Sequence, residues 1–120
     1  MNATFDLSCA LWHPTVPPTA ILAVVGLDAK TQWSVGEVNP VTGLRRDRTY
    51  CRFELGNYTQ QYISDSLEVL VRFQGLETIG FYQGGRIVVY FKNVSDASEL
   101  YINRGALKMI DRISASIVFR

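Results

Sequence analysis

Trp33 is the most distinctive residue in the part of the chain that could do binding chemistry. It lies between Gly26, which we expect to end a helix, and the pair Gly36 and Glu37. Glycine allows sharp turns, so a large amphipathic ring held here either fills the core beneath a loop or anchors a partner protein. The sequence leaves both interpretations of Trp33 open.

Four arginines provide the second candidate for binding. Arg46, Arg48 and Arg52 have even spacing, and Tyr50 lies between the last two. Side chains two residues apart share one face of an extended strand, so these residues predict a basic stripe. Such a stripe suits an acidic protein surface or, as the alternative, the phosphates of a nucleic acid. The predicted binding residues are Trp33, Glu37, Arg45, Arg46, Arg48, Tyr50 and Arg52.

Catalytic chemistry has little support in this sequence. Its one histidine, His13, lies four residues from Cys9 on an expected strand, which separates the two by roughly 13 Å at the rise of a strand. That distance is too long for a base to activate a thiol. A pairing of His13 with Cys51 across the sheet stays open. One histidine and two distant cysteines also lack metal-ligand spacing. We expect a protein that is not an enzyme, with no metal and no cofactor.

Composition limits the class of protein. The chain has 120 residues, 48% of them apolar, and a formal net charge of +1. No apolar run approaches the roughly 18 residues of a membrane span, and no basic-then-apolar leader is recognisable. We expect one domain over residues 1–120, located in the cytoplasm, with no membrane contact and with Cys9 and Cys51 as buried free thiols.

Periodicity and turn residues predict the elements that position these groups. Alternating apolar residues predict strands at Thr4–Trp12, Thr49–Leu55, Arg86–Lys92 and Ile113–Phe119. Helices are expected from Pro17 to Gly26, from a start between Thr59 and Asp65 to Gln74–Gly75, and after Asn103. A mostly irregular connection is expected from Leu27 to Arg48, and a short edge strand at Glu99–Ile102. Residues 77–83 are ambiguous, with a strand favoured over a helix.

The order β-α-β-α-β(β)-α-β predicts an α+β fold. In such a fold, a mainly antiparallel sheet of four to six strands is covered on one face by two or three helices. We place Arg86–Lys92 inside the sheet because it is apolar on both faces.

Several spacings resemble those of the bacterial domain of unknown function 4279 family. They are the proline-bearing helix followed by Gly26-Leu27, the Trp33-x-x-Gly36-Glu37 loop, the strand from Tyr50 to Leu55, and the terminal unit of Leu100-x-Ile102, Ala106-Leu107 and Ile113–Phe119. The resemblance covers nearly the whole chain. It implies a small bacterial or phage-borne α+β protein that acts by binding.

Two functions follow as hypotheses. The first is a protein-binding module that blocks or sequesters a partner stoichiometrically, as immunity proteins and phage-encoded inhibitors do. The alternative is a nucleic-acid or nucleotide-binding module that uses the stripe from Arg45 to Arg52. A homodimer formed through exposed sheet edges is also compatible with the sequence.

Overall fold

The computed structural model describes residues 4–59, 68–95 and 104–120. One mixed sheet of five strands, in the order β2-β3-β1-β4-β5, lies beneath three helices. Every strand pair is antiparallel except β4 with β5. The elements are β1 (Thr4–His13), α1 (Pro18–Val25), β2 (Thr31–Trp33), β3 (Thr49–Thr59), the 3₁₀ helix η2 (Glu68–Ile79), β4 (Arg86–Lys92), α3 (Arg104–Arg112) and β5 (Ala115–Phe119). The predicted α+β class is confirmed.

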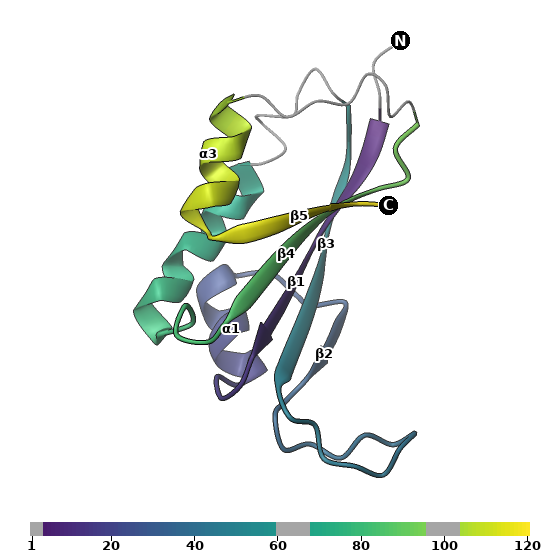
Figure 1. The fold of residues 1–120 in the computed structure, drawn as a ribbon, viewed down its shortest axis with the longest axis vertical. Helices are drawn as coiled ribbons and strands as arrows, with labels where there is room; N and C mark the ends of the chain where they lie inside the picture. Colours follow the sequence, from purple (N-terminus) through teal and green to yellow (C-terminus); the bar gives the residue numbers. More distant parts are fainter. Residues whose placement is uncertain (1–3, 60–67, 96–103) are drawn as a thin grey trace.

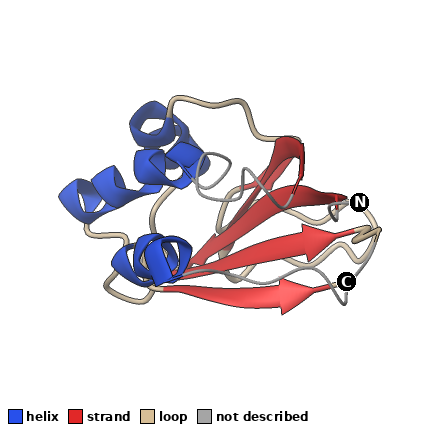
Figure 2. Ribbon diagram, turned by 90° about the horizontal axis from the view of Figure 1, so that it is seen from above, coloured by secondary structure: helices blue, strands red, loops and turns tan. Residues whose placement is uncertain are grey.

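All three helices cover the same face of the sheet (Figures 1 and 2). None of the described helices lies on the opposite face, and we call it the open face. Strand β1 occupies the centre, and its alternating residues Phe5, Leu7, Cys9 and Leu11 are fully buried beneath the helices, as predicted.

The open face of β1 departs from the expected exposure. Alternation in a half-buried strand places Ser8 and Ala10 on the face turned away from the core, yet each is only 1% exposed. They are small, and the longer Glu54 and Tyr90 stand opposite Ser8 on the two neighbouring strands. A strand paired on both sides is therefore shielded on its open face as well, even without a covering helix.

Helix α1 follows the sequence rules closely. Pro18 takes the first turn, where a missing N–H costs nothing. Gly26 ends the helix with φ +71°, and its N–H donates to the Leu22 carbonyl at 2.9 Å. The helix thereby turns Ile21 and Val25 into the core.

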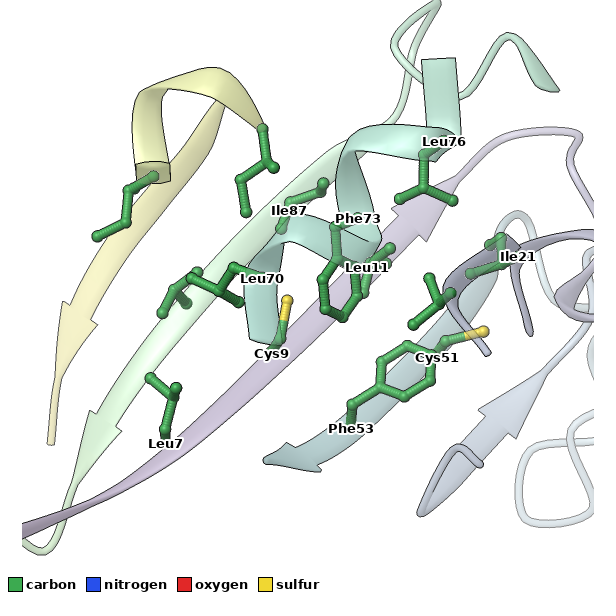
Figure 3. Packing of buried hydrophobic residues seen from close by; sticks show 14 of the residues in the cluster. Leu7, Cys9, Leu11, Ile21, Cys51, Phe53, Leu70, Phe73, Leu76 and Ile87 are labelled. Atoms are coloured by element: carbon green, nitrogen blue, oxygen red, sulfur yellow. The ribbon is translucent and has the colours of Figure 1, made fainter. Parts of the chain in front are cut away.

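The core forms where η2 lies over the centre of the sheet. Leu70, Phe73 and Leu76 of η2 face Cys9, Leu11 and Phe53 of the strands (Figure 3). Phe73 meets Phe53 edge to face, with ring centres 5.5 Å apart. Both cysteines are free and fully buried, as predicted.

The predicted helix end at Gln74–Gly75 is wrong, because η2 continues past Gly75 to Ile79. The helical alternative for residues 77–83 is confirmed as far as Ile79. Gly75 allows α1 and η2 to pack closely, because a Cβ at this position would lie only 2.9 Å from Cγ1 of Val24 on α1. The true end is Gly80, at φ +70°, where the Phe81 N–H donates to the Leu76 carbonyl at 3.2 Å. Residues 80–83 form a turn, so the favoured strand is absent.

Strand β3 is longer than predicted. Gly56, expected to end the strand, adopts φ +130° in a bulge opposite the step from Leu7 to Ser8, and pairing continues to Thr59. Strand β5 begins only at Ala115. Alternation from Ile113 through Ala115 and Ile117 predicts that Phe119 faces inward, and this is wrong, because Phe119 is 55% exposed.

Other predictions fall on segments that the structure does not describe. These are the start of the second helix beyond Thr59, the edge strand at Glu99–Ile102 and the Asn103 cap. Among the described helices, none is long and apolar enough to cross a membrane.

Candidate functional site

A hairpin extends beyond the sheet between β2 and β3, and we call residues 34–48 the arm (Figure 1). The Arg46 N–H donates to the Glu37 carbonyl at 2.7 Å, and the Gly36 N–H donates to the Arg46 carbonyl at 2.8 Å. Nearer the tip, the Asn39 N–H donates to the Leu44 carbonyl at 2.8 Å. The connection predicted to be mostly irregular therefore contains a strand and an ordered hairpin.

Glu37, a predicted binding residue, closes the turn that starts the arm. Its carboxylate accepts the Ser34 N–H at 2.9 Å, and its own N–H donates to the Ser34 carbonyl at 3.1 Å. A carboxylate that caps its own turn shapes the arm, so Glu37 has a structural role here.

The arm exposes three aliphatic side chains. Val38 is 49% exposed, Leu44 is 70% exposed, and Val41 at the tip is 91% exposed. Arms that only connect strands are usually polar, because exposed aliphatic groups are unfavourable in water. These residues were missed as binding candidates because single apolar residues near Pro40 and Gly43 are typical of an ordinary loop.

Three aromatic rings stand side by side on the open face where the arm joins the sheet. Trp33 of β2 stacks on Tyr50 of β3, with centres 4.5 Å apart and planes at 29°. Tyr50 in turn meets Trp12 of β1 at 5.2 Å. The register explains the row, because Tyr50 is paired with Trp33 on one side and Trp12 on the other.

An arginine stands over each end of this row. The guanidinium carbon of Arg46 lies 3.9 Å from the centre of the Trp33 ring, and that of Arg86 lies 5.2 Å from the Trp12 ring. We call the five residues the aromatic–arginine row: Arg46, Trp33, Tyr50, Trp12 and Arg86. The quadrupoles of the two tryptophan rings attract the two guanidinium groups, so the contacts at both ends of the row are electrostatically favourable.

Trp33 lies outside the core. It is half-buried on the open face, on a strand, and its neighbours are Tyr50 and Arg46. The core-plug interpretation of Trp33 is therefore wrong.

The predicted arginine stripe is not continuous. Arg46 and Arg48 precede β3, and only Arg52 belongs to that strand. Arg45 donates from Nη1 to the Gly36 carbonyl at 2.9 Å, within the arm. The structure brings Arg46 to Trp33 and leaves Arg48 on the exposed arm.

Acidic side chains partly neutralise the remaining arginines. Arg52 Nε lies 3.5 Å from the Glu54 carboxylate, which Lys92 also approaches at 3.6 Å. Arg48 Nε lies 3.6 Å from Asp47 on the exposed arm. Arg52 is therefore neutralised on the sheet, whereas Arg48 keeps only one exposed partner.

Trp12 and Arg86 were missed by the site prediction. Trp12 reads as an outward residue at the end of a strand, and Arg86 as the first residue of another strand 74 positions away. Only the pairing of β1 with β4 brings them together, and no local sequence pattern reports that pairing.

Two surface hollows adjoin the row. The first, of about 270 Å³, lies at the ends of the strands and is lined by Trp12, His13, Pro14, Asp47, Arg48, Gly84 and Arg86. The second, of about 410 Å³, lies under the arm and is lined by Trp12, Trp33, Asn39, Thr42, Leu44, Arg45, Arg46, Asp47 and Arg48. They share Trp12, Asp47 and Arg48, so the arm and the strand ends border one concave basic and aromatic surface.

His13 borders the first hollow, and its buried ring lies against that of Phe81, with centres 5.3 Å apart. Its Nδ1 accepts the backbone N–H groups of Thr15 at 3.0 Å and Val16 at 2.9 Å. Nδ1 must be unprotonated to accept them, which places the ring proton on Nε2. The residue is 3% exposed, and Nε2 has no hydrogen-bond partner among the described residues.

The cysteines do not make a nucleophile with His13. Burial raises the pKa of the Cys51 thiol to about 11 and raises that of Cys9 further. A thiol that stays protonated near neutral pH is a poor nucleophile. Within residues 4–59, 68–95 and 104–120, no three histidine, cysteine or acidic side chains gather as metal ligands would.

Comparison of the chain with protein families, with curated proteins and with solved structures gives no match. The resemblance to the domain of unknown function 4279 family stays a prediction.

Proposed function

We propose that this chain is a non-enzymatic module that binds a partner protein through the arm and the aromatic–arginine row. One observation carries the proposal: the arm that exposes Val38, Val41 and Leu44 joins the sheet at a row of two tryptophans, a tyrosine and two arginines, and Leu44 lines one hollow with both tryptophans. Tryptophan, tyrosine and arginine are the residues that most often dominate protein interfaces, and aliphatic groups add buried area.

The arrangement of the row favours protein over nucleic acid. Bases bind by stacking on free ring faces, but each ring here lies against a neighbouring ring or guanidinium. The carboxylates of Asp47 and Glu54 also interrupt the arginines that would follow a phosphate backbone. Nucleic-acid or nucleotide binding through Arg45 to Arg52 remains the alternative.

Stoichiometric action fits the chemistry of the described residues. The buried, protonated thiols and the capping role of His13 support binding as the whole activity. In this proposal the protein blocks or sequesters its partner, in the manner of an immunity protein or a phage-encoded inhibitor. Two unpaired cysteines support a reducing compartment, the cytoplasm. Self-association through a sheet edge is a further proposal, supported by the unpaired outer edge of β5 among the described strands.

An affinity pulldown tests the proposal. The tagged chain is exposed to bacterial lysate with and without nuclease, at low and high salt, and bound proteins are identified by mass spectrometry. We expect one protein in near-equal amount to the bait under all four conditions. Nucleic acid that is recovered only at low salt would support the alternative.

Matched variants make the pulldown specific for the site. Val41→Asp and Leu44→Asp place a charge on the exposed arm, and both should lose the partner. Leu107→Asp makes the same change on α3, where Leu107 is 47% exposed on the helix side, and should keep it. Equal recovery by arm and α3 variants would contradict a binding site on the arm.

A further inference from the structure

The hollow at the strand ends is rich in hydrogen-bond donors and poor in acceptors. Trp12, Arg48 and Arg86 bring side-chain donors to its lining, and its only carboxylate is Asp47. Such a lining repels cations and leaves N–H groups without acceptors, so it suits an anionic group.

The two arginines of this hollow are weakly compensated. Arg86 makes no ion pair within the described part of the chain, and its contact is with the Trp12 ring. A cation–π contact uses the charge of a guanidinium and leaves its in-plane N–H donors free. Arg48 has Asp47 at 3.6 Å, but the side chains are 54% and 84% exposed, and pairs in that setting contribute little.

Two further donors lack partners. Nε2 of His13 is buried and carries a proton with no acceptor, as its Nδ1 contacts require. The indole N–H of Trp12 makes no hydrogen bond within the described residues; the ring contacts are its only side-chain interactions there. The indole N–H of Trp12 is therefore free to donate to an incoming acceptor, whereas Nε2 of His13 belongs to a buried ring that packs against Phe81.

We propose that this hollow receives an aspartate or glutamate side chain of the partner protein, held by Arg48 and Arg86. This inference rests on the proposed function and deepens it, since it names the chemistry that the partner presents. A carboxylate offers two oxygens in one plane, which matches the fork of a guanidinium. Apolar residues beside that carboxylate would lie on Leu44, which borders the adjoining hollow together with Trp12 and Arg48.

The same surroundings favour a carboxylate on a polypeptide over a nucleic-acid phosphate. The aliphatic arm beside the hollow gives a peptide side chain a surface to cover, whereas a nucleic acid has no comparable group. Asp47 would also repel the further phosphates of a continuous backbone. We therefore expect a partner segment that alternates acidic and apolar residues.

A titration followed by ¹⁵N NMR tests the inference on the intact chain. The probe is an acetylated and amidated hexapeptide of alternating leucine and glutamate, and the signals are the Trp12 indole N–H and the Nε–H of Arg48 and Arg86. We expect saturable shifts of these signals. The same peptide with glutamine in place of glutamate should bind at least about tenfold more weakly, as a charge-assisted pair requires.

Variants separate the hollow from general basicity. Arg48→Gln and Arg86→Gln should each weaken binding of the acidic peptide at least about fivefold. Arg48→Gln removes only one exposed ion pair, so it tests the site even if Arg86→Gln loosens the row. Arg112→Gln on α3, exposed on the helix side, is the matched control and should bind as the unmodified chain does.

The outcomes distinguish this inference from the proposed function. Equal binding of the glutamine peptide, or no shift up to about 5 mM acidic peptide, would overturn carboxylate recognition and leave the pulldown result standing. Shifts caused by an oligothymidylate but not by the peptide would overturn the inference. Loss of arm-dependent capture in the pulldown would overturn the proposed function instead.

Discussion

Arg46 and Trp33 join the arm to the sheet. Arg46 belongs to the arm, Trp33 ends β2, and the guanidinium carbon lies 3.9 Å from the ring centre. Aromatic stacking and exposed cation–π contacts contribute about 0.5–1.5 kcal/mol each, less than a ring buried in a core. The row therefore gives modest stability and presents large side chains at the surface.

Replacing Trp33 should separate binding from folding. We expect Trp33→Ala to lower the free energy of unfolding by about 1–2 kcal/mol, because one stack and one cation–π contact are lost. Urea denaturation measures this, and the partner should no longer be captured. Phe53→Ala is the comparison, and should cost about 3–5 kcal/mol because its ring is fully buried. Equal losses for the two variants would place Trp33 in the core after all.

Asp6 makes the free energy of unfolding depend on pH in the acidic range. Hydrogen bonds from Asn57 at 2.8 Å and Asn93 at 2.7 Å lower the pKa of its carboxyl in the folded state, with Lys92 adding a smaller effect. A lowered folded pKa means that the stabilisation is present above the unfolded pKa, near 3.9, and is lost as pH falls through the folded value. The carboxylate form therefore stabilises the fold at neutral pH.

The Asp6 effect can be isolated by a double-variant comparison. Asp6→Asn should lower the urea midpoint at pH 7, and the gap from the unmodified chain should narrow at pH 3. In an Asn57→Ala, Asn93→Ala background the gap should change much less with pH, because the two hydrogen bonds are gone and only the smaller effect of Lys92 remains. A gap that is constant with pH in the unmodified background would contradict the assignment.

The thiols of Cys9 and Cys51 should be unreactive in the folded state. Burial raises the pKa of Cys51 to about 11 and that of Cys9 further, and both are fully buried between helices and sheet. A thiol-specific reagent at pH 8 should therefore react only in urea, with two thiols per chain. Rapid reaction of one thiol in native buffer would show that the helix layer opens over that residue.

The site could be predicted from sequence only in part. Trp33, Arg46 and Tyr50 were recognised from residue type and spacing, and they do come together. Trp12 and Arg86 were missed because they reach the row through pairing between distant strands. The turn-capping role of Glu37 was missed because a side chain that caps its own turn looks the same in sequence as a free carboxylate.

The helices and strands could likewise be predicted from sequence only in part. Strand β1 and helix α1 were predicted well because their signals are local. Apolar residues alternate along β1, and α1 begins at a proline and ends at a glycine. Gly56 and Gly75 were both misread as ends of elements. Gly56 forms a bulge, and Gly75 allows helix α1 to approach closely. Both roles depend on the residues that lie opposite each glycine in the fold.

Gly75 gives a prediction whose sign depends on Val24. Gly75→Ala should destabilise the chain by about 1 kcal/mol, because the new Cβ would lie 2.9 Å from Cγ1 of Val24. In a Val24→Ala background that atom is absent, and the same change should stabilise by up to about 1 kcal/mol, since alanine favours helix over glycine. Urea denaturation of the four chains measures the coupling. Independent, additive effects would rule out the close approach of α1 and η2.

The molecule as a whole is two-sided. Helices cover one face, the open face carries the aromatic–arginine row, and the arm extends the long axis, whose extent is 47 Å against 20 Å for the shortest (Figures 1 and 2). Stability resides in the layer between helices and sheet, whereas the proposed binding groups lie outside that layer.

Removing the tip of the arm should therefore leave the fold intact. Replacing residues 38–45 with a two-residue Asn-Gly turn should keep cooperative unfolding, with a change of about 1 kcal/mol or less, because Val38, Val41 and Leu44 are exposed. The partner should be lost. Calorimetry and the pulldown measure the two effects, and loss of cooperative unfolding would mean that the arm supports the core.

The central position of β1 has a consequence for synthesis. Its antiparallel partners run up to Thr59 in β3 and from Arg86 in β4, so β1 leaves the ribosome before either partner exists. At about 5–20 residues per second, the nascent strand waits several seconds with unpaired backbone and apolar side chains exposed. A chaperone that recognises extended apolar segments would find its best target in residues 5–11, and production of this protein should depend on such protection more than its small size suggests.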